Sequence, residues 1–457
     1  MDFVKLKSLC NFEKGSTGLA KAEPGDYPLV TTGAERKSSN TYQFDTKAIC
    51  IPLVSSTGHG HASLKNVHYQ EGKFALGSIL VALTSKDNNK LDIQFLHLYL
   101  SQLKDQVLVP LMSGAANVAL SVKKIQEIEI PLPTILRQRE IVDKFKSIFR
   151  EEEELKSELT HQQILLKKLR QQILQEAIEG KLTADWRAQN PDVEPASELL
   201  KRIATEKNQL VKKKKIKAQK SLSPISDEEK PFDLPQGWEW CKLGSIFNFI
   251  DYRGKTPKKL SSGIRLITAK NVKKGTLSLL PEDFISREEY EERMTRGFPV
   301  TGDLLFTTEA PLGNVCLLTV ADEEISTGQR LITLQGHSSE IKSKLYMFFI
   351  LSPFYQDYLV HNATGVTAKG IKASRLKELA IPVPSPSEQA TIIDKVEKLL
   401  VLCDQLESQI NQNQTHAEQL MQTVLKEAFT QNIKSKAMVI NENNSPVGLR
   451  GNMDRLY

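Results

Sequence analysis

The sequence predicts an α+β protein in which two globular domains are separated by an antiparallel coiled coil of two long helices, with a pseudo-twofold internal repeat. Two observations predict this fold: stretches 251 residues apart match each other, and each is followed by a long segment with apolar residues at three- and four-residue spacing. The predicted segments are a domain at 1–130, a spacer helix at 131–182, a Lys-rich linker at 183–234, a second domain at 235–381, a second spacer helix at 382–433 and a polar tail at 434–457.

The repeat is clearest where each globular domain ends. Residues 124–144 align without gaps with 375–395, and eight of 21 positions are identical where chance would give about one. Near the start of each domain the matching stretches are "VKLKSL" and "CKLGSI", at 4–9 and 241–246, and their offset is 237. The second copy therefore carries about 14 extra residues, which we place between Thr268 and Thr364.

Each copy ends in a predicted long helix. No proline or glycine occurs between Pro133 and Gly180, or between Pro386 and Pro446. Apolar residues in both segments, among them Leu169 and Leu406, follow the stripe of a coiled coil for about six heptads. The doubled prolines of "IPLP" and "IPVP" keep the preceding residues out of the helix, and Thr134 and Ser385 or Ser387 are candidate caps. A helix this long needs a partner, and we expect that partner to be the other copy, antiparallel to it; a generic structural coiled coil fits the same pattern.

Composition places the chain among globular proteins and names no function. It has 457 residues, 40% hydrophobic and 25% charged, with a net charge of +6. No apolar run approaches the ~20 residues of a membrane-spanning helix, and the N-terminus lacks the apolar stretch of a signal peptide, so we expect a cytoplasmic protein. The five cysteines are scattered and form no C-x-x-C pair, which argues against a disulfide framework or a zinc ribbon.

The small net charge conceals a local excess. From Asp251 to Lys274 there are eight basic residues and one acid, and acidic residues dominate from Glu282 to Glu292. This segregation predicts a one-sided positive field that a phosphate backbone would feel. The lysine-rich stretch at 206–220 is typical of a solvated connector. The alternative is that its lysines make nonspecific contacts with DNA phosphates.

Signatures of catalysis are missing from the sequence. There is no G-x-x-x-x-G-K-[ST] phosphate loop, no Asn/Asp-Pro-Pro-aromatic motif of amino-methyltransferases and no third ligand beside His59 and His61 for a metal. The pattern favours a binding protein that holds no metal or cofactor of its own.

The chain resembles the DNA-specificity (S) subunits of type I restriction–modification enzymes over nearly its whole length. The resemblance rests on "LPQGWEWCKLGSI" at 234–246, "LRQQILQEAIEGKLTADWR" at 169–187 and the doubled proline–helix junctions at Pro131/Pro133 and Pro382/Pro384. One departure is that the second helix ends in "KEAFTQNI", without the Glu-Gly-Lys-Leu found at 179–182.

The resemblance implies two target-recognition domains that each read half of a bipartite, asymmetric DNA site. It implies a coiled coil that acts as a spacer and docks two methyltransferase subunits, with two restriction (translocase-nuclease) subunits in the full complex. It further implies that catalysis, S-adenosylmethionine, ATP and Mg²⁺ belong to those partners and that this chain is noncatalytic.

Charge and loop character, rather than any family motif, select the candidate DNA contacts. Basic and amide side chains suit phosphates and base edges, and the glycine-containing loops at 113–118 and 363–370 allow close approach to a ligand. The candidates are Arg36, Lys37, Asn40, Arg253, Lys255, Lys258, Lys259, Lys270, Asn271, Lys273, Lys274, Thr364, Thr367 and Lys369.

Two other classes of function remain open from the residues alone. One is a coiled-coil adaptor whose globular ends bind proteins and which has no DNA specificity; the basic cluster argues against it. The other is a single-chain enzyme with an unrecognised site.

Overall fold

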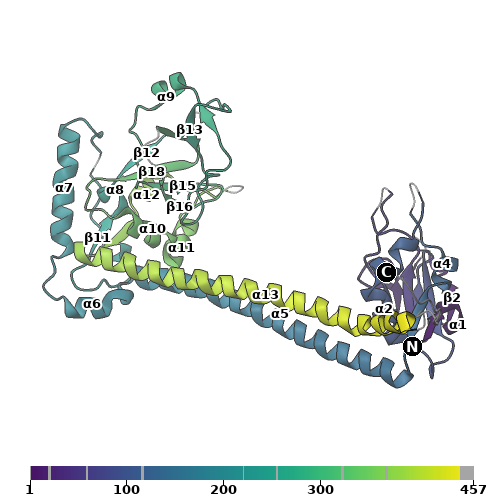
Figure 1. The fold of residues 1–457 in the computed structure, drawn as a ribbon. Helices are drawn as coiled ribbons and strands as arrows, with labels where there is room; N and C mark the ends of the chain where they lie inside the picture. Colours follow the sequence, from purple (N-terminus) through teal and green to yellow (C-terminus); the bar gives the residue numbers. More distant parts are fainter. Residues whose placement is uncertain are drawn as a thin grey trace, which may run out of the picture. The chain divides into compact units, whose positions relative to one another are not determined.

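A computed structural model describes residues 2–18, 22–57, 60–114, 118–219, 221–253, 256–320, 324–365 and 369–442 (Figure 1). The chain divides into two compact units: Met1–Leu159 with Gln412–Tyr457, and Thr160–Asn411. Each unit contains one of the two globular domains.

The first globular domain is built from three small sheets. One has the order β2-β9-β6-β7, from strands Cys10–Lys14, Leu80–Ser85, Ala48–Pro52 and His68–Gln70; a second has the order β4-β3-β8-β5, from Lys37–Ser39, Tyr27–Val30, Lys73–Leu76 and Phe44–Asp45. Strands β1 (Asp2–Lys5) and β10 (Glu129–Leu132) form a separate antiparallel pair. The helices are α1 (Leu6–Leu9), α2 (Ile93–Gln102), α3 (Lys104–Val107), the 3-10 turn η1 (Val109–Leu111) and α4 (Val122–Gln126).

The second globular domain repeats this arrangement. Its main sheet has the order β12-β18-β15-β16, from Phe247–Asp251, Leu331–Gly336, Leu304–Thr307 and Val315–Leu317; the smaller sheet has the order β14-β13-β17, from Phe284–Ile285, Ile264–Ile267 and Ile325–Thr327. Strands β11 (Glu239–Lys242) and β19 (Ala380–Val383) pair as β1 and β10 do. Its helices are α8 (Leu243–Ile246), α9 (Arg287–Arg293), α10 (Ser343–Leu351), α11 (Pro353–His361) and α12 (Ala373–Lys377).

Strand registers confirm the predicted repeat residue by residue. Asp2 lies opposite Leu132 in one domain and Glu239 lies opposite Val383 in the other, which are the predicted offsets of 237 and 251. The parallel partners Val30 and Leu76 likewise correspond to Ile267 and Thr327. The 14 extra residues of the second copy therefore lie between β13 and β17, inside the wider interval that the sequence predicted.

The two predicted long helices are present. α5 runs from Ile135 to Ile178 and α13 from Pro386 to Glu442, nine residues beyond its predicted end. The Arg137 N–H donates to Thr134 Oγ1 at 3.4 Å, as expected of a cap, whereas the buried Ser385 hydroxyl has no hydrogen-bond partner among the described residues. The interpretation of Ser385 as a cap is therefore wrong, because Pro386 begins the helix without it.

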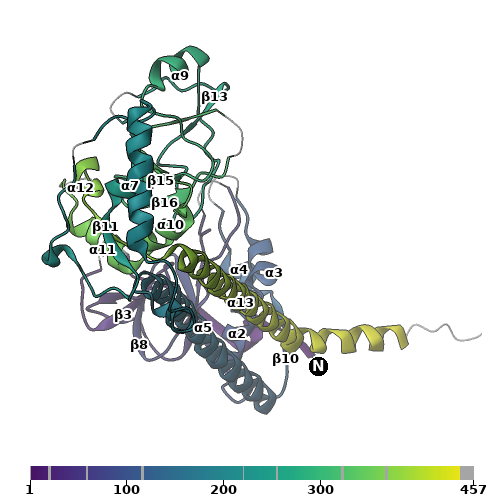
Figure 2. The ribbon, with the colours of Figure 1, turned by 90° about the vertical axis from the view of Figure 1, so that its left-hand side faces the viewer.

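Within the second unit, α5 and α13 pack side by side and antiparallel (Figures 1 and 2). Gln163 donates to Asn411 at 3.5 Å, while Arg170, 7 residues further along α5, pairs with Asp404, 7 residues earlier on α13. The buried residues along the two helices include Leu166, Ile173, Val396, Cys403 and Ile410. Leu169 and Leu406, which the stripe placed on the seam, are instead 45% and 52% exposed. The two-helix coiled coil buries about one apolar position per heptad here, and the neighbouring apolar side chains, such as Leu169 and Leu406, remain in contact with solvent.

The segment predicted as a linker contains helical structure. The 3-10 turn η2 (Lys181–Thr183), α6 (Ala184–Gln189), α7 (Ala196–Lys212) and the 3-10 turn η3 (Asp227–Glu229) all lie within or at the start of it. α7 is strongly amphipathic: it buries Leu199 and Ile203, and Arg202 on it forms an ion pair with Glu340 at 2.7 Å. Apolar residues at three- and four-residue spacing, rather than the lysines, decide the structure of this stretch.

The five cysteines are buried and free. Burial raises the pKa of Cys10 and Cys50 to about 12, so both thiols stay protonated and packed as small apolar groups. In the described part of the chain, no helix has the length and apolar character needed to span a bilayer.

Asp303 makes the stability of the second domain depend on pH. It is 4% exposed, and burial raises its pKa from 3.8 to about 7, against the hydrogen bonds that it accepts from Val300 and Gln335. Between about pH 4 and pH 7 the folded protein keeps a proton that the unfolded chain has released, so stability falls as pH rises through this window. Asp303→Asn should remove this loss and raise the free energy of unfolding at pH 8, by roughly 1.4 kcal/mol for each pKa unit of the shift.

Urea denaturation between pH 4 and pH 8 measures the effect. The exposed Asp192, changed to Asn, is the matched control and should leave the pH profile unchanged. Parallel profiles for wild type and Asp303→Asn would contradict the assignment.

Candidate functional site

Two of the segments that carry the family resemblance meet at a buried carboxylate on α13. Glu388 is 1% exposed and accepts hydrogen bonds from Thr183 Oγ1 at 2.6 Å, Trp238 Nε1 at 2.7 Å and Arg187 Nη2 at 2.8 Å. Arg187 also donates to the carbonyl oxygen of Gly180, which sits at φ +68° where α5 ends. The segments at 169–187 and 234–246 are therefore joined structurally, through the start of the second long helix.

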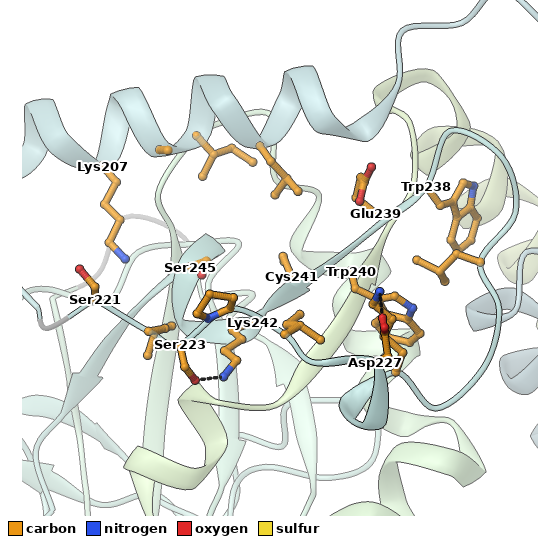
Figure 3. Close-up of a pocket in the computed structure, with 18 of the residues that line it drawn as sticks. Lys207, Ser221, Ser223, Asp227, Trp238, Glu239, Trp240, Cys241, Lys242 and Ser245 are labelled. Atoms are coloured by element: carbon orange, nitrogen blue, oxygen red, sulfur yellow. Dashed lines mark hydrogen bonds and ion pairs between the residues drawn. The ribbon is translucent and has the colours of Figure 1, made fainter.

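A groove of about 1210 Å³ lies between α7 and the chain at 219–245 (Figure 3). Lys242 on its floor is 3% exposed; its Nζ donates to Ser223 Oγ at 2.6 Å and pairs with Glu378. Lys207 reaches from α7 and donates to the carbonyl oxygen of Gly244 at 3.0 Å. These ammonium groups bond within the domain, so the groove reflects how the linker wraps on β11 and is not a cationic surface.

In the first domain, the candidate residues divide between the interior and the surface. Arg36 is half-buried: its guanidinium contacts Gln70 Oε1 at 2.8 Å and His68 Nδ1 at 3.2 Å, and desolvation lowers its pKa. Lys37 on β4 and Asn40 are both exposed, and Asn40 donates to Glu23 Oε2 at 2.7 Å. Arg36 is thus engaged in packing its own domain, and Lys37 and Asn40 are the candidates here that face solvent.

In the second domain, the fold brings the acidic segment back onto the basic one. Lys259 pairs with Asp283 at 2.6 Å and Arg265 pairs with Glu282 at 3.3 Å. The backbone N–H of Lys258 donates to Glu289 at 3.0 Å. The predicted one-sided field is therefore wrong as stated, because β13 and β14 pair antiparallel and place opposite charges beside each other.

Asn271 also differs from its predicted role. It is 1% exposed, and its carboxamide accepts from the backbone N–H of Thr268 and donates to the carbonyl oxygens of Ser278 and Pro281. Its hydrogen-bonding groups hold the loop together, which removes it from the candidate DNA contacts. Lys270, Lys273 and Lys274 around it are exposed, and none of the three forms an ion pair within the described residues.

Other candidates converge on a cleft of about 470 Å³. Arg253 and Thr364 both line it, although one follows β12 and the other follows α11. Arg253 pairs with Asp251 at 2.7 Å and donates to Thr308 Oγ1 at 3.2 Å. Burial opposes the ionisation of Asp251, but the hydrogen bonds and charge of Arg253 hold its pKa below the ordinary value.

The loop around the cleft is partly described. Thr364 exchanges backbone hydrogen bonds with Gly370, and Ser113 does the same with Ala119 in the first domain. Lys369 is exposed. The candidates Lys255 and Thr367 lie outside the described residues.

Sequence reasoning missed four residues that line the same cleft: Thr308, Glu309, Gln329 and Arg330. Glu309 and Arg330 form an ion pair at 3.1 Å in which both side chains remain substantially exposed. Thr308 and Glu309 follow β15 as Leu53 and Val54 follow β6, and Gln329 and Arg330 follow β17 as Ser78 and Ile79 follow β8. The register of the repeat reveals these equivalences, and a search for basic clusters does not.

Both globular domains match one family model. The model, described as the type I restriction modification DNA specificity domain, matches residues 1–162 and 235–414.

Named relatives agree with this match. The chain is 36% identical to the type I restriction enzyme EcoAI specificity subunit of Escherichia coli over 249 residues, which are 52% of this chain and 40% of that protein. It is 33% identical to the EcoEI specificity subunit of Escherichia coli, over 54% of this chain and 42% of that protein, so it spans about two fifths of the length of these two relatives. It is 23% identical to the Escherichia coli EcoDI specificity subunit over 93% of this chain and 87% of that protein.

Solved structures share the fold. The HsdS subunit from Thermoanaerobacter tengcongensis superposes with a TM-score of 0.53 at 16% identity, covering 94% of this chain and 96% of that one. A chain from a study of assembly and conformational transition of the type I restriction–modification system gives 0.53 at 15% identity, covering 94% and 97%. With its duplicated domains, its paired long helices and a family model that matches both copies, the chain belongs to the type I restriction modification DNA specificity domain family.

Proposed function

We propose that this chain is the DNA-specificity subunit of a type I restriction–modification complex, and that it reads a bipartite, asymmetric DNA site. The observation that carries the proposal is the match of both copies of one fold to a DNA specificity domain. Two copies with different surfaces suit two different half-sites. The coiled-coil adaptor without DNA specificity is not favoured, because the family match covers the globular domains rather than the helices alone.

The proposed division of labour follows the two parts of each copy. Base-edge contacts from the globular domains would specify sequence, and exposed lysines would supply salt-dependent affinity for phosphates. The long helices would act as a spacer, since readers on one face of DNA need a separation of about one turn, ~34 Å, or a multiple of it.

The same helices would dock the partner subunits. Six large apolar side chains of the coiled coil in the second unit are between 45% and 53% exposed, an unusual density for a surface that meets only water. They are Ile164, Leu165, Leu169, Val401, Leu402 and Leu406. We propose two methyltransferase subunits as occupants, with two restriction subunits in the complete complex.

Chemistry would belong to those partners. S-adenosylmethionine, ATP and Mg²⁺ would bind there, and this chain would act without catalysing a reaction. A complex that reads cellular DNA would work in the cytoplasm.

The test is sequence-specific binding and methylation by the complex of this chain with its methyltransferase subunits. Methylation sequencing should reveal one bipartite motif, and a duplex with that motif should bind at least 10³-fold more tightly than a scrambled duplex at one stated salt concentration. Equal binding to both duplexes would overturn the proposal. Methylation or cleavage by the isolated chain would show that it is an enzyme.

Lys273 and Lys274 should contribute affinity without sequence preference. Both are exposed at the turn after Asn271, where an ammonium group can reach a phosphate. The double change Lys273→Ala, Lys274→Ala should weaken binding to specific and scrambled duplexes alike and reduce the slope of log K against log[salt] by up to about 1.8. Lys201→Ala, at an exposed lysine of α7, is the control and should leave the slope unchanged. A loss confined to the specific duplex would contradict a phosphate contact.

A further inference from the structure

We infer that the turn Gln329–Arg330 in the second domain reads base edges of its half-site, with Glu309 as the residue that positions Arg330. This inference rests on the proposed function and names the side chains that deliver specificity at one site.

The two domains share the backbone around this turn. In the first domain, the backbone N–H of Leu53 donates to the carbonyl oxygen of Ile79 at 2.9 Å. In the second domain, the backbone N–H of Thr308 donates to the carbonyl oxygen of Arg330, also at 2.9 Å. The next position of each strand forms a bridge to the following loop, Val54 with Ala119 in one domain. Glu309 forms the equivalent bridge with Gly370 in the other.

Side chains on this common backbone differ in chemistry. The first domain presents Leu53, Val54, Ser78 and Ile79; the second presents Thr308, Glu309, Gln329 and Arg330. Elsewhere the equivalent positions keep their character, as in the buried pairs Val30/Ile267 and Leu83/Leu334. A surface that changes from apolar to charged while its backbone is kept is expected where two domains must distinguish different half-sites.

Gln329 and Arg330 have the chemistry of base readers. Arginine can donate two hydrogen bonds to the O6 and N7 of guanine, and glutamine can pair with the N6 and N7 of adenine. Both line the cleft of about 470 Å³, and Gln329 is also hydrogen-bonded to Thr256 across the adjoining loop. The turn is therefore held in place at its first residue and presents a guanidinium at its second.

Arg330 is held in a conformation that the fold alone does not require. Its φ is +64°, a left-handed conformation that is uncommon for a residue with a side chain, while Ile79 is not among the described residues at positive φ. Its Nε pairs with Glu309 at 3.1 Å, and the two side chains are 52% and 40% exposed, so the pair contributes little to stability. A strained backbone with an oriented, solvent-facing guanidinium points to recognition.

Arg253 has a different role in the same cleft. Its guanidinium is bonded to both carboxylate oxygens of Asp251 and to Thr308. These bonds make it part of the wall that shapes the cleft, leaving the turn as the reading element.

The test uses the full chain in complex with its methyltransferase subunits and three variants at the turn. Arg330→Asn removes the guanidinium and suits the left-handed backbone, Arg330→Lys keeps the charge but loses the two-pronged donor, and Gln329→Ala removes the amide. The methylated motif is read by sequencing, with the half-site of the first domain as an internal control. Each Arg330 variant should lose roughly 5- to 150-fold discrimination at one base pair of the second half-site. Gln329→Ala should lose discrimination over the same range at a neighbouring base pair.

Arg287→Asn is the matched control, because Arg287 is also 52% exposed and pairs with an exposed glutamate, Glu324, but does not line the cleft. It should leave both half-sites unchanged. The inference is overturned if the Arg330 variants keep the wild-type motif and rate, or if they weaken methylation equally at all sequences, which would indicate a phosphate contact. Absence of any bipartite motif for the wild-type complex would instead overturn the proposed function.

Discussion

Glu388→Ala should cost the second unit about 3–5 kcal/mol of unfolding free energy. The carboxylate is 1% exposed and accepts from Thr183, Trp238 and Arg187, so its removal leaves three donors unpaired and Arg187 without its ion partner in a half-buried position. Glu388→Gln keeps the volume but loses the charge, and should cost less than the alanine change.

The experiment can follow the second unit alone. The three tryptophans, Trp186, Trp238 and Trp240, all lie between residues 160 and 411, so fluorescence during urea denaturation reports that unit. The control lies in the same unit: Lys398 on α13 has a side chain that is 73% exposed, and Lys398→Ala should change the stability of the second unit by less than about 0.5 kcal/mol. A loss below about 1 kcal/mol for Glu388→Ala would contradict the buried junction.

Much of the architecture could be predicted because it depends on patterns that act along the chain. The offsets of 237 and 251 anticipated which strands pair in each domain, since duplicated sequences form duplicated registers. The absence of proline and glycine between Pro133 and Gly180 predicted α5 to within a few residues. Helix periodicity could not assign Leu169 and Leu406 to solvent, because exposure in a coiled coil depends on how many helices meet, and the stripe does not state that number.

Electrostatic predictions failed where distant segments meet. Lys259 and Asp283 are 24 residues apart, and only the antiparallel bridge between their neighbours Leu260 and Phe284 shows that their charges cancel. Asn271 has the residue type of a polar loop contact, yet its carboxamide donates to the carbonyl oxygens of Ser278 and Pro281, which lie within ten positions of it. Charge counts along a sequence therefore overstate the field of a domain whose acidic and basic segments are adjacent strands.

Part of the candidate site could be predicted from the sequence, and part of it could not. Arg253 and Thr364 were selected from separate clues and lie on the same cleft. Gln329 and Arg330 were not selected, because "TGQRL" carries neither a charge cluster nor a motif. Their significance emerges from the equivalence with Ser78 and Ile79, which requires the strand pairing of both domains.

Gln138→Ala should destabilise the start of α5 and its contacts with the first domain by about 3 kcal/mol. The side chain is fully buried, donates to the carbonyl oxygens of Lys90 and Pro133 at 2.8 Å, and accepts from the backbone N–H of Asp92 at 2.8 Å. Each unpaired buried group costs about 1–3 kcal/mol. Asp92 caps α2, so hydrogen exchange of the amides at 92–102, followed by mass spectrometry, should accelerate in the variant.

Gln389 is the repeated residue, and its comparison with Gln138 sharpens the prediction. It keeps the bond to the proline carbonyl, from Nε2 to Pro384 at 3.4 Å, but its Oε1 has no hydrogen-bond partner within the described structure. Gln389→Ala should therefore cost less than Gln138→Ala, and Gln171→Ala, at an exposed position of α5, should cost almost nothing. Equal losses for both repeated glutamines would mean that the shared proline–helix junction, rather than the additional bonds to Lys90 and Asp92, determines why this residue recurs in the two copies.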